Sequence, residues 1–158
     1  ASAPARIVSV SSEGHRFGPM DFDDLQSERA YQGMAYIAAM RVYGRSKLAN
    51  LLFSNELARR LEGTGVTANA LHPGAVSTRL GQNNASGKLL TTLLKPFFKT
   101  PEQGAATSVH VATAPELEGV SGEYFTNERL AKASAAARDA QSARRLWDVS
   151  LELTGLSD

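Results

Sequence analysis

Residues 6–12 read RIVSVSS, and residues 43–47 read YGRSK at the head of a long apolar-striped segment. The first run is short and rich in valine and isoleucine, which is typical of a buried parallel strand. The second places Tyr43 and Lys47 four residues apart, so on a helix they share one face about one turn apart. A buried strand and a long helix together favour an α/β fold.

The composition suits one folded domain of ordinary character. The chain has 158 residues, of which 42% are hydrophobic and 21% charged, enough to build one hydrophobic core. A net charge of +1 gives no indication of nucleic-acid binding. The absence of cysteine excludes disulfides and thiol nucleophiles, and the three histidines lack the spacing of metal ligands, so we expect no metal site.

The same composition bears on location. No apolar run approaches the roughly 20 residues that span a bilayer, and residues 1–5 lack the pattern of a signal peptide. We therefore expect a cytoplasmic protein without a transmembrane segment. The apolar segment 88–99 leaves peripheral membrane association open, although a flap over an apolar substrate or a plain packing helix explains it more simply.

Strand and helix patterns alternate along the whole chain, which predicts a parallel sheet with flanking helices. Thr100, Pro101 and Gln103 form a helix start with a capping box. The expected strands cover 6–11, 66–71 and 122–126. The expected helices cover 34–61, 88–99, 101 to between 113 and 115, and 134–153.

Ser11 and Ser12 end the first expected strand, at the edge where open α/β sheets bind their ligands. Ser12 is the better candidate, because strand alternation turns Ser11 the other way. An ammonium stabilises a phenolate, so Tyr43 beside Lys47 can exchange a proton with an alcohol or carbonyl oxygen. Ser12 can donate a hydrogen bond to the same oxygen. Taken singly, these residues also fit a surface tyrosine, a solvated lysine and a loop-capping serine.

A second polar loop, HPGAVST at 72–78, follows the next expected strand. Its Pro-Gly turn exposes backbone amides, and Thr78 adds a hydroxyl. Such a loop can hold a carboxamide or a phosphate, although an ordinary turn fits it as well. The sequence has no Gly-x-Ser-x-Gly elbow that would indicate a hydrolase.

In their order, these motifs resemble the C-terminal half of the short-chain dehydrogenase/reductase family, and within it the retinol-dehydrogenase-like and WW-domain-oxidoreductase-like branch. The resemblance implies a Rossmann-type doubly wound parallel sheet with flanking helices. Residues 1–158 would form a single partial domain, the catalytic and substrate-binding half. The blocks that carry the resemblance are 10–12 with His15, 43–50, 55–61, 65–67, 72–78, 99–105 and 146–148.

The resemblance implies an NAD(P)-dependent oxidoreductase that moves a hydride between nicotinamide and a small apolar alcohol or carbonyl substrate, retinoid- or steroid-like. Tyr43 would be the general acid/base, Lys47 would support it and bind the nicotinamide ribose, and Ser12 would orient the reacting oxygen. Residues 83–98 would form a substrate flap. The implied cofactor-binding set is Tyr43, Lys47, Pro73, Gly74, Val76 and Thr78.

The sequence also departs from the family pattern. The Thr-Gly-x-x-x-Gly-x-Gly loop that cradles the pyrophosphate does not precede Arg6, and the residue that selects NAD or NADP is absent too. The resemblance favours NADP over NAD, and we expect little or no activity from these 158 residues alone. The alternative is a non-catalytic truncated module that acts by protein interaction. The two apolar stripes of 34–61 fit either a homodimer interface or contacts within a larger sheet.

Overall fold

The computed structural model describes residues 3–29, 35–76 and 98–157. Its sheet contains β1 (Ala5–Val10), β2 (Val66–His72), β3 (Tyr124–Thr126) and β4 (Arg129–Leu130), in that order. The first three strands run parallel, which confirms the predicted α/β class, while β4 turns back antiparallel to β3. β4 was not predicted, because two residues are too short to show a strand period.

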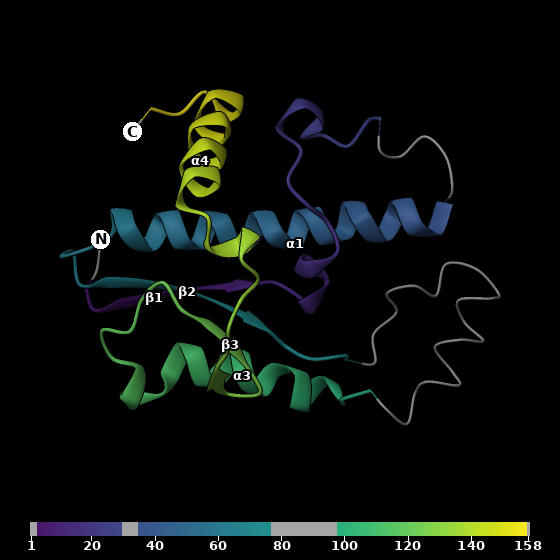
Figure 1. The fold of residues 1–158 in the computed structure, drawn as a ribbon. Helices are drawn as coiled ribbons and strands as arrows, with labels where there is room; N and C mark the ends of the chain where they lie inside the picture. Colours follow the sequence, from purple (N-terminus) through teal and green to yellow (C-terminus); the bar gives the residue numbers. More distant parts are fainter. Residues whose placement is uncertain (1–2, 30–34, 77–97, 158) are drawn as a thin grey trace.

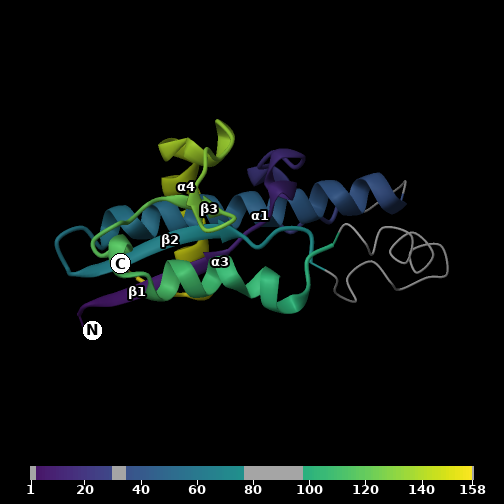
Figure 2. The same ribbon diagram turned by 90° about the horizontal axis from the view of Figure 1, so that it is seen from below.

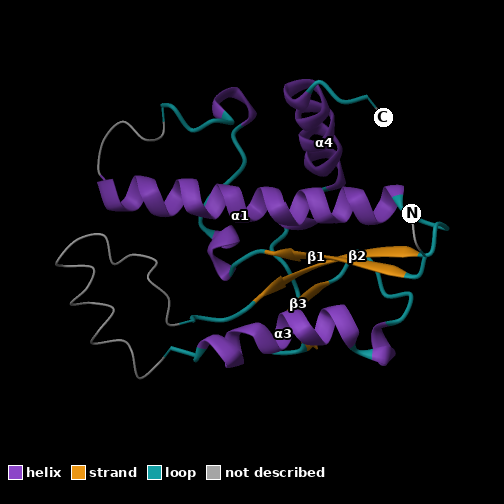
Figure 3. Cartoon of the chain, turned by 180° about the vertical axis from the view of Figure 1, so that it is seen from behind, coloured by secondary structure: helices purple, strands orange, loops and turns teal. Residues whose placement is uncertain are grey.

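Helices cover both faces of the sheet (Figure 1). α1 (Ala35–Arg60) lies along one face and α3 (Pro101–Thr113) along the other, as the view from behind also shows (Figure 3). The predicted capping box of α3 is confirmed, with Thr100 accepting from the backbone of Gln103 and the Gln103 side chain accepting from Thr100. Met34 and most of the predicted 88–99 helix lie outside the described residues.

The C-terminal helix differs from the prediction in its start. α4 covers Ala140–Thr154, and residues 136–138 form a separate 3₁₀ turn, so a helix from residue 134 was wrong. The Asp139 carboxylate accepts from the backbone of Gln141 and Ser142, which fixes the first turn of α4 at this point. In the alanine-rich run before it, the Ser134 hydroxyl accepts from the Ala137 amide over 3.2 Å, and this bond reaches only the short 3₁₀ turn. α4 crosses α1 on the side away from the sheet (Figure 1).

Two hydrophobic clusters hold the layers together. One joins α1 to β2, β3 and α4, and the other joins β2 and β3 to α3. β2 is buried on both faces, since Ala70 enters the first cluster and Leu71 the second. β1 is the edge strand, with Ile7 39% and Val10 47% exposed.

The parallel register places the two candidate loops at one edge. Val10 of β1 pairs with Leu71 of β2, so Ser12, after β1, and His72, the last residue of β2, lie at the same carboxyl end of the sheet. The turned view shows both strands ending on the side where the first half of α1 projects (Figure 2). Among the described residues, no helix combines the length and apolar character needed to cross a membrane.

Candidate active site

Ser12 lies at the carboxyl end of β1 and caps a 3₁₀ turn over Glu13–Arg16. Its Oγ accepts a hydrogen bond from the Gly14 amide over 3.1 Å. That bond uses a lone pair and leaves the hydroxyl proton available for donation. The Ser12 hydroxyl can therefore still donate one hydrogen bond, which is the capacity that its predicted role requires.

Two side chains tie α1 to the end of β1. The buried Ser11 hydroxyl donates to the Lys47 carbonyl oxygen over 2.8 Å, and the Asn50 amide donates to the Val10 carbonyl over 3.1 Å. Ser11 thus faces α1 rather than a ligand, in agreement with the sequence argument for Ser12. These bonds fix the position of α1 along β1. They therefore also fix the position of Tyr43, one helical turn before Lys47, relative to the end of that strand.

A close contact of glycines brings the first half of α1 against the turn after β1. A Cβ at Gly44 would lie 2.6 Å from the Gly14 carbonyl oxygen and 2.8 Å from the Gly18 nitrogen. A Cβ at Gly18 would collide with the backbone of Arg41 and Arg45. Only glycine permits backbones to approach so closely, so these positions set the distance between the Ser12 turn and Tyr43.

Tyr43 meets the Ser12 turn at Gly14, and Lys47 lies over the Tyr43 ring. A Cβ at Gly14 would lie 2.9 Å from Cε1 of Tyr43 and 3.4 Å from Oγ of Ser12, so the ring and the hydroxyl flank the same glycine. The Lys47 Nζ lies 5.6 Å from the centroid of the Tyr43 ring, within range of a cation–π contact. The structure therefore brings all three predicted catalytic residues to one place.

Arg45, inside the same motif, fastens the loop before α1. Its guanidinium donates to the carbonyl oxygens of Pro19 and Asp24 and to the Ser27 hydroxyl, over 3.2, 2.9 and 3.2 Å. The Asp21 and Asp24 carboxylates lie 3.8 and 4.0 Å away. Arg45, inside the motif at residues 43–47, thus holds the loop of residues 19–27 against α1.

A second tyrosine near the site has a different role. Tyr124 of β3 donates its hydroxyl to Glu13 over 2.9 Å, and Arg16 donates to the other Glu13 oxygen over 2.6 Å. Burial, then the bond to Glu13, raises the pKa of Tyr124 above its usual range, so it remains a phenol. Burial raises the pKa of Glu13, but the hydrogen bonds from Arg16 and Tyr124 outweigh it and hold it below its usual value.

The loop after β2 carries the predicted cofactor residues Pro73, Gly74 and Val76. Gly74 adopts φ +95°, and a Cβ there would lie 2.8 Å from the Lys99 side chain. Val76 pairs with Lys99 in an isolated parallel bridge, and the Lys99 amide donates to the Ala75 carbonyl over 2.7 Å. Thr78 lies outside the described residues, as does most of the predicted flap at 83–98.

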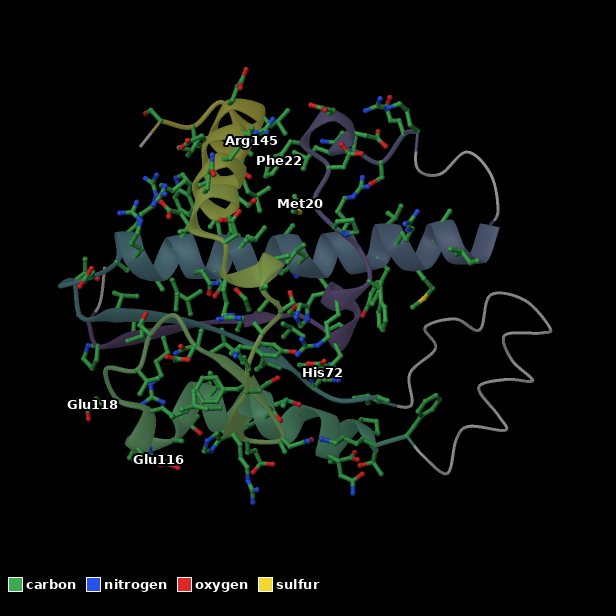
Figure 4. The ribbon with its side chains drawn as sticks, in the orientation of Figure 1. Met20, Phe22, His72, Glu116, Glu118 and Arg145 are labelled. Atoms are coloured by element: carbon green, nitrogen blue, oxygen red, sulfur yellow. The ribbon has the colours of Figure 1, made fainter. Side chains whose placement is uncertain are left out.

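His72 is the last residue of β2 (Figure 4). Its Nδ1 is buried and has no hydrogen-bond partner. Burial lowers the pKa of His72, although nearby Glu13 opposes this, and the shift favours the neutral imidazole. The common carboxyl edge of the sheet is what relates the Pro73–Val76 loop to Ser12 and Tyr43.

Sequence reasoning missed the residues that hold the site together. Gly44 interrupts an otherwise helical pattern, which is a recognisable signal of a close contact. Ser11 and Asn50 gave no such signal, because their partners are backbone carbonyls distant in sequence. A cavity of about 1040 Å³ opens at the opposite, amino end of the strands, between residues 61–67 and 118–122. None of the predicted site residues that the structure describes lines it.

Comparison with known proteins places these residues in a family context. The model of the short chain dehydrogenase family matches residues 30–89, which include Tyr43, Lys47 and the loop to Thr78. A crystal structure of an uncharacterized protein from Mycobacterium Paratuberculosis superimposes with a TM-score of 0.65 at 29% identity, covering 97% of this chain and 51% of that one. The fold is therefore shared with half of a larger solved chain.

Closer relatives cover nearly all of the sequence. The chain is 48% identical to mouse retinol dehydrogenase 12 over 98% of its length and 47% of the relative's, and 48% identical to human retinol dehydrogenase 14 over 99% and 46%. It is 47% identical to the chicken WW domain-containing oxidoreductase over 96% and 37%. The chain thus spans about half the length, or less, of these curated relatives. The resemblance to short-chain dehydrogenases, and to their retinol-dehydrogenase-like branch, is confirmed.

Proposed function

Starting from this resemblance to the short-chain dehydrogenase family, we propose that the chain is the catalytic half of an NAD(P)-dependent oxidoreductase. Its substrate is an alcohol or carbonyl compound. The single observation that carries the proposal is that Ser12 and Tyr43 flank Gly14 at the carboxyl end of a parallel sheet, with Lys47 over the Tyr43 ring. A structural cluster would not need an available serine hydroxyl beside a paired tyrosine and lysine.

The residues present fit the nicotinamide end of the cofactor. The left-handed Gly74 brings the loop backbone close against Lys99, and Lys47 supplies ammonium donors at the same sheet edge. We assign the nicotinamide ribose to Tyr43 and Lys47 and the nicotinamide to Pro73, Gly74, Val76 and Thr78. The cofactor, when bound, supplies or accepts the hydride. No glycine-rich loop for the pyrophosphate occurs in these 158 residues.

The side chains have distinct tasks in the proposed reaction. During reduction, the Ser12 hydroxyl donates a hydrogen bond to the carbonyl oxygen and holds it beside Tyr43. Tyr43 gives its hydroxyl proton to that oxygen, and the positive charge of Lys47 stabilises the phenolate that remains. In the oxidative direction, the phenolate takes the alcohol proton back. These steps account for the proton, and the nicotinamide accounts for the hydride.

The substrate we propose is apolar and retinoid-like, with NADP favoured over NAD. Relatives named retinol dehydrogenases support the choice of substrate, while the choice of NADP rests on the family resemblance alone. The surface near Tyr43 offers apolar side chains as well: Met40, one turn earlier on α1, is 39% exposed, and Phe17, beside Gly18, is 65% exposed. Apolar groups at the entrance favour a hydrophobic substrate over a charged one.

Binding of nicotinamide mononucleotide is the first test, because this probe needs only the nicotinamide end of the site. In an NMR titration of the purified chain, we expect shifts at the amides of Tyr43, Lys47 and Val76. Lys47→Ala should weaken binding about tenfold, while the exposed Lys132→Ala should not change it. A chain that folds but shows no shifts would contradict the proposal and favour the non-catalytic interaction module.

Turnover is the second test. NADPH oxidation with retinal should be low or undetectable in the isolated chain, and higher in a longer protein that contains the pyrophosphate loop. Tyr43→Phe removes the transferable proton and should abolish whatever turnover is present. Unchanged turnover in that variant would remove Tyr43 from the mechanism.

A further inference from the structure

The turn after β1 is held from behind by a buried histidine that the proposed reaction does not use. His15 is 2% exposed, and its Nδ1 lies 2.7 Å from the Ser12 carbonyl oxygen. The Ser134 amide donates to its Nε2 over 3.2 Å, across 119 residues of sequence. One imidazole thus joins the backbone of the catalytic turn to the segment that leads from β4 to α4.

The two hydrogen bonds define which nitrogen of the His15 ring carries the proton. A nitrogen that accepts an amide hydrogen carries no proton, so Nε2 is bare and Nδ1 carries the ring proton. Nδ1 therefore donates to the Ser12 carbonyl. The ring also meets Tyr124 edge-on, with centroids 5.5 Å apart. A rotation of the buried ring would lose both hydrogen bonds, which makes this a rigid link.

Ser12 takes part in two further hydrogen bonds besides the one from the His15 ring. Its carbonyl also accepts from the His15 amide over 3.0 Å, and its Oγ accepts from Gly14. Oγ and the Tyr43 ring flank the same glycine. A small displacement of the turn would therefore move the hydroxyl relative to Tyr43. Displacements of about 1 Å can lower a rate by about a hundredfold.

We propose that His15 is a positioning residue, whose Nδ1 bond to the Ser12 carbonyl fixes the direction of the Ser12 hydroxyl. The Ser134 bond anchors the ring for this purpose. The inference rests on the proposed role of Ser12. A second cross-link, from the exposed Arg16 to the Lys132 carbonyl over 2.9 Å, holds the same two segments without touching Ser12.

Two substitutions separate the two ring nitrogens. In His15→Asn, the side-chain amide stands near the position of Nδ1 and can still donate to Ser12, but it cannot reach Ser134. In His15→Gln, the longer amide reaches toward Nε2 and can accept from Ser134, but the donor to Ser12 is lost. Arg16→Ala is the matched control, since it removes a cross-link between the same segments.

The rotamer of Ser12 is the primary measurement, because a space-filling role would not distinguish the two variants. Three-bond couplings measured by NMR report that rotamer, and hydrogen exchange reports the Ser134 amide. We expect one Ser12 rotamer in the wild type, Arg16→Ala and His15→Asn, and averaging in His15→Gln. The Ser134 amide should lose protection in His15→Asn and keep it in His15→Gln.

Equal Ser12 averaging in both His15 variants, or in neither, would overturn the proposal. If His15→Gln does not fold, His15→Asn decides alone: a retained Ser12 rotamer supports the proposal and a lost one overturns it. In a preparation with turnover, His15→Gln should lower kcat at least about tenfold with KM within about twofold. Absence of wild-type turnover in a longer protein that contains the pyrophosphate loop would count against the proposed function, while the rotamer comparison would still judge the role of His15.

Discussion

The two halves of α1 differ sharply in their surroundings. From Leu48 onward the helix is packed, with Leu51 and Leu52 no more than 1% exposed, whereas Ile37 and Met40 in the first half are 58% and 39% exposed. Tyr43 and Lys47 lie at the junction. The packed half supplies a rigid support, and the open half leaves room for a substrate to reach the tyrosine.

α4 covers part of the outer side of the packed half, where Phe53 is still 38% exposed. Phe53 stacks on Trp147 of α4 at 4.8 Å and 20°, and the Arg60 guanidinium lies 4.6 Å from the Trp147 ring. Arg145 of α4 covers Phe22 of the preceding loop at 4.3 Å (Figure 4). α4 therefore occupies part of the helix surface that a homodimer through α1 would need. Such a dimer would have to use the first turns of α1.

Truncation of Leu52 should have the largest effect on stability. Leu52→Ala leaves a cavity in the cluster between α1, the sheet and α4, and should lower the free energy of unfolding by about 2–5 kcal/mol. Ile37→Ala, on the open half of the same helix, should change it by less than about 0.5 kcal/mol. Urea unfolding followed by circular dichroism measures both. Similar losses would mean that the two halves are equally packed.

The sequence predicted this contrast only in part. Of the two apolar stripes of residues 34–61, the one formed by Leu48, Leu51 and Leu52 is buried as predicted, while the other is only partly buried and leaves Phe53 38% exposed. The predicted meeting of two strand ends at one sheet edge agrees with the register of β1 and β2. The partner on the outer side could not be predicted, because the contact of Phe53 with Trp147 joins residues far apart in the chain. The backbone contact at Gly44 depends on the path of a polar loop that has no periodic pattern.

Gly44→Ala tests the junction, where two effects oppose each other. Alanine favours a helix by about 1 kcal/mol over glycine, but its Cβ would press on the backbone of Gly14 and Gly18, at a cost of about 1–3 kcal/mol. We expect a net loss of about 1–2 kcal/mol in thermal or urea unfolding. The exposed Ser46→Ala, two residues along, should be neutral or stabilising. A stabilised Gly44→Ala would show that the loop is not in contact.

Ser11→Ala should have a smaller effect, because it removes one buried hydrogen bond to the Lys47 carbonyl. We expect a loss of about 1 kcal/mol in unfolding free energy. Amide hydrogen exchange should also become faster at the end of β1, while the exchange of Leu51 and Leu52 stays slow. If protection falls throughout α1, the bond supports the whole helix rather than the junction.

The smallest effect on stability should come from lowering the pH, through Glu56 in the packed half of α1. Glu56 is buried on α1, where Arg59 donates to it over 2.6 and 2.9 Å and Arg60 over 2.8 Å. The hydrogen bond from Arg59, then that from Arg60, outweighs burial and lowers the pKa of Glu56 from its ordinary 4.5. Folding therefore favours the charged carboxylate.

This shift sets the direction of the pH dependence. The stabilisation from Glu56 is complete above about pH 4.5, the ordinary value, and is lost as the pH falls through the lower pKa of the folded chain. Arg59 is 53% exposed, so solvent screening keeps the effect small. Urea midpoints measured from neutral pH into acid should fall less steeply in Glu56→Gln than in the wild type, with the exposed Glu118→Gln as control (Figure 4). Identical acid profiles in all three would mean that the arginine contacts of Glu56 do not persist in solution, and that the packed half of α1 depends on its apolar contacts alone.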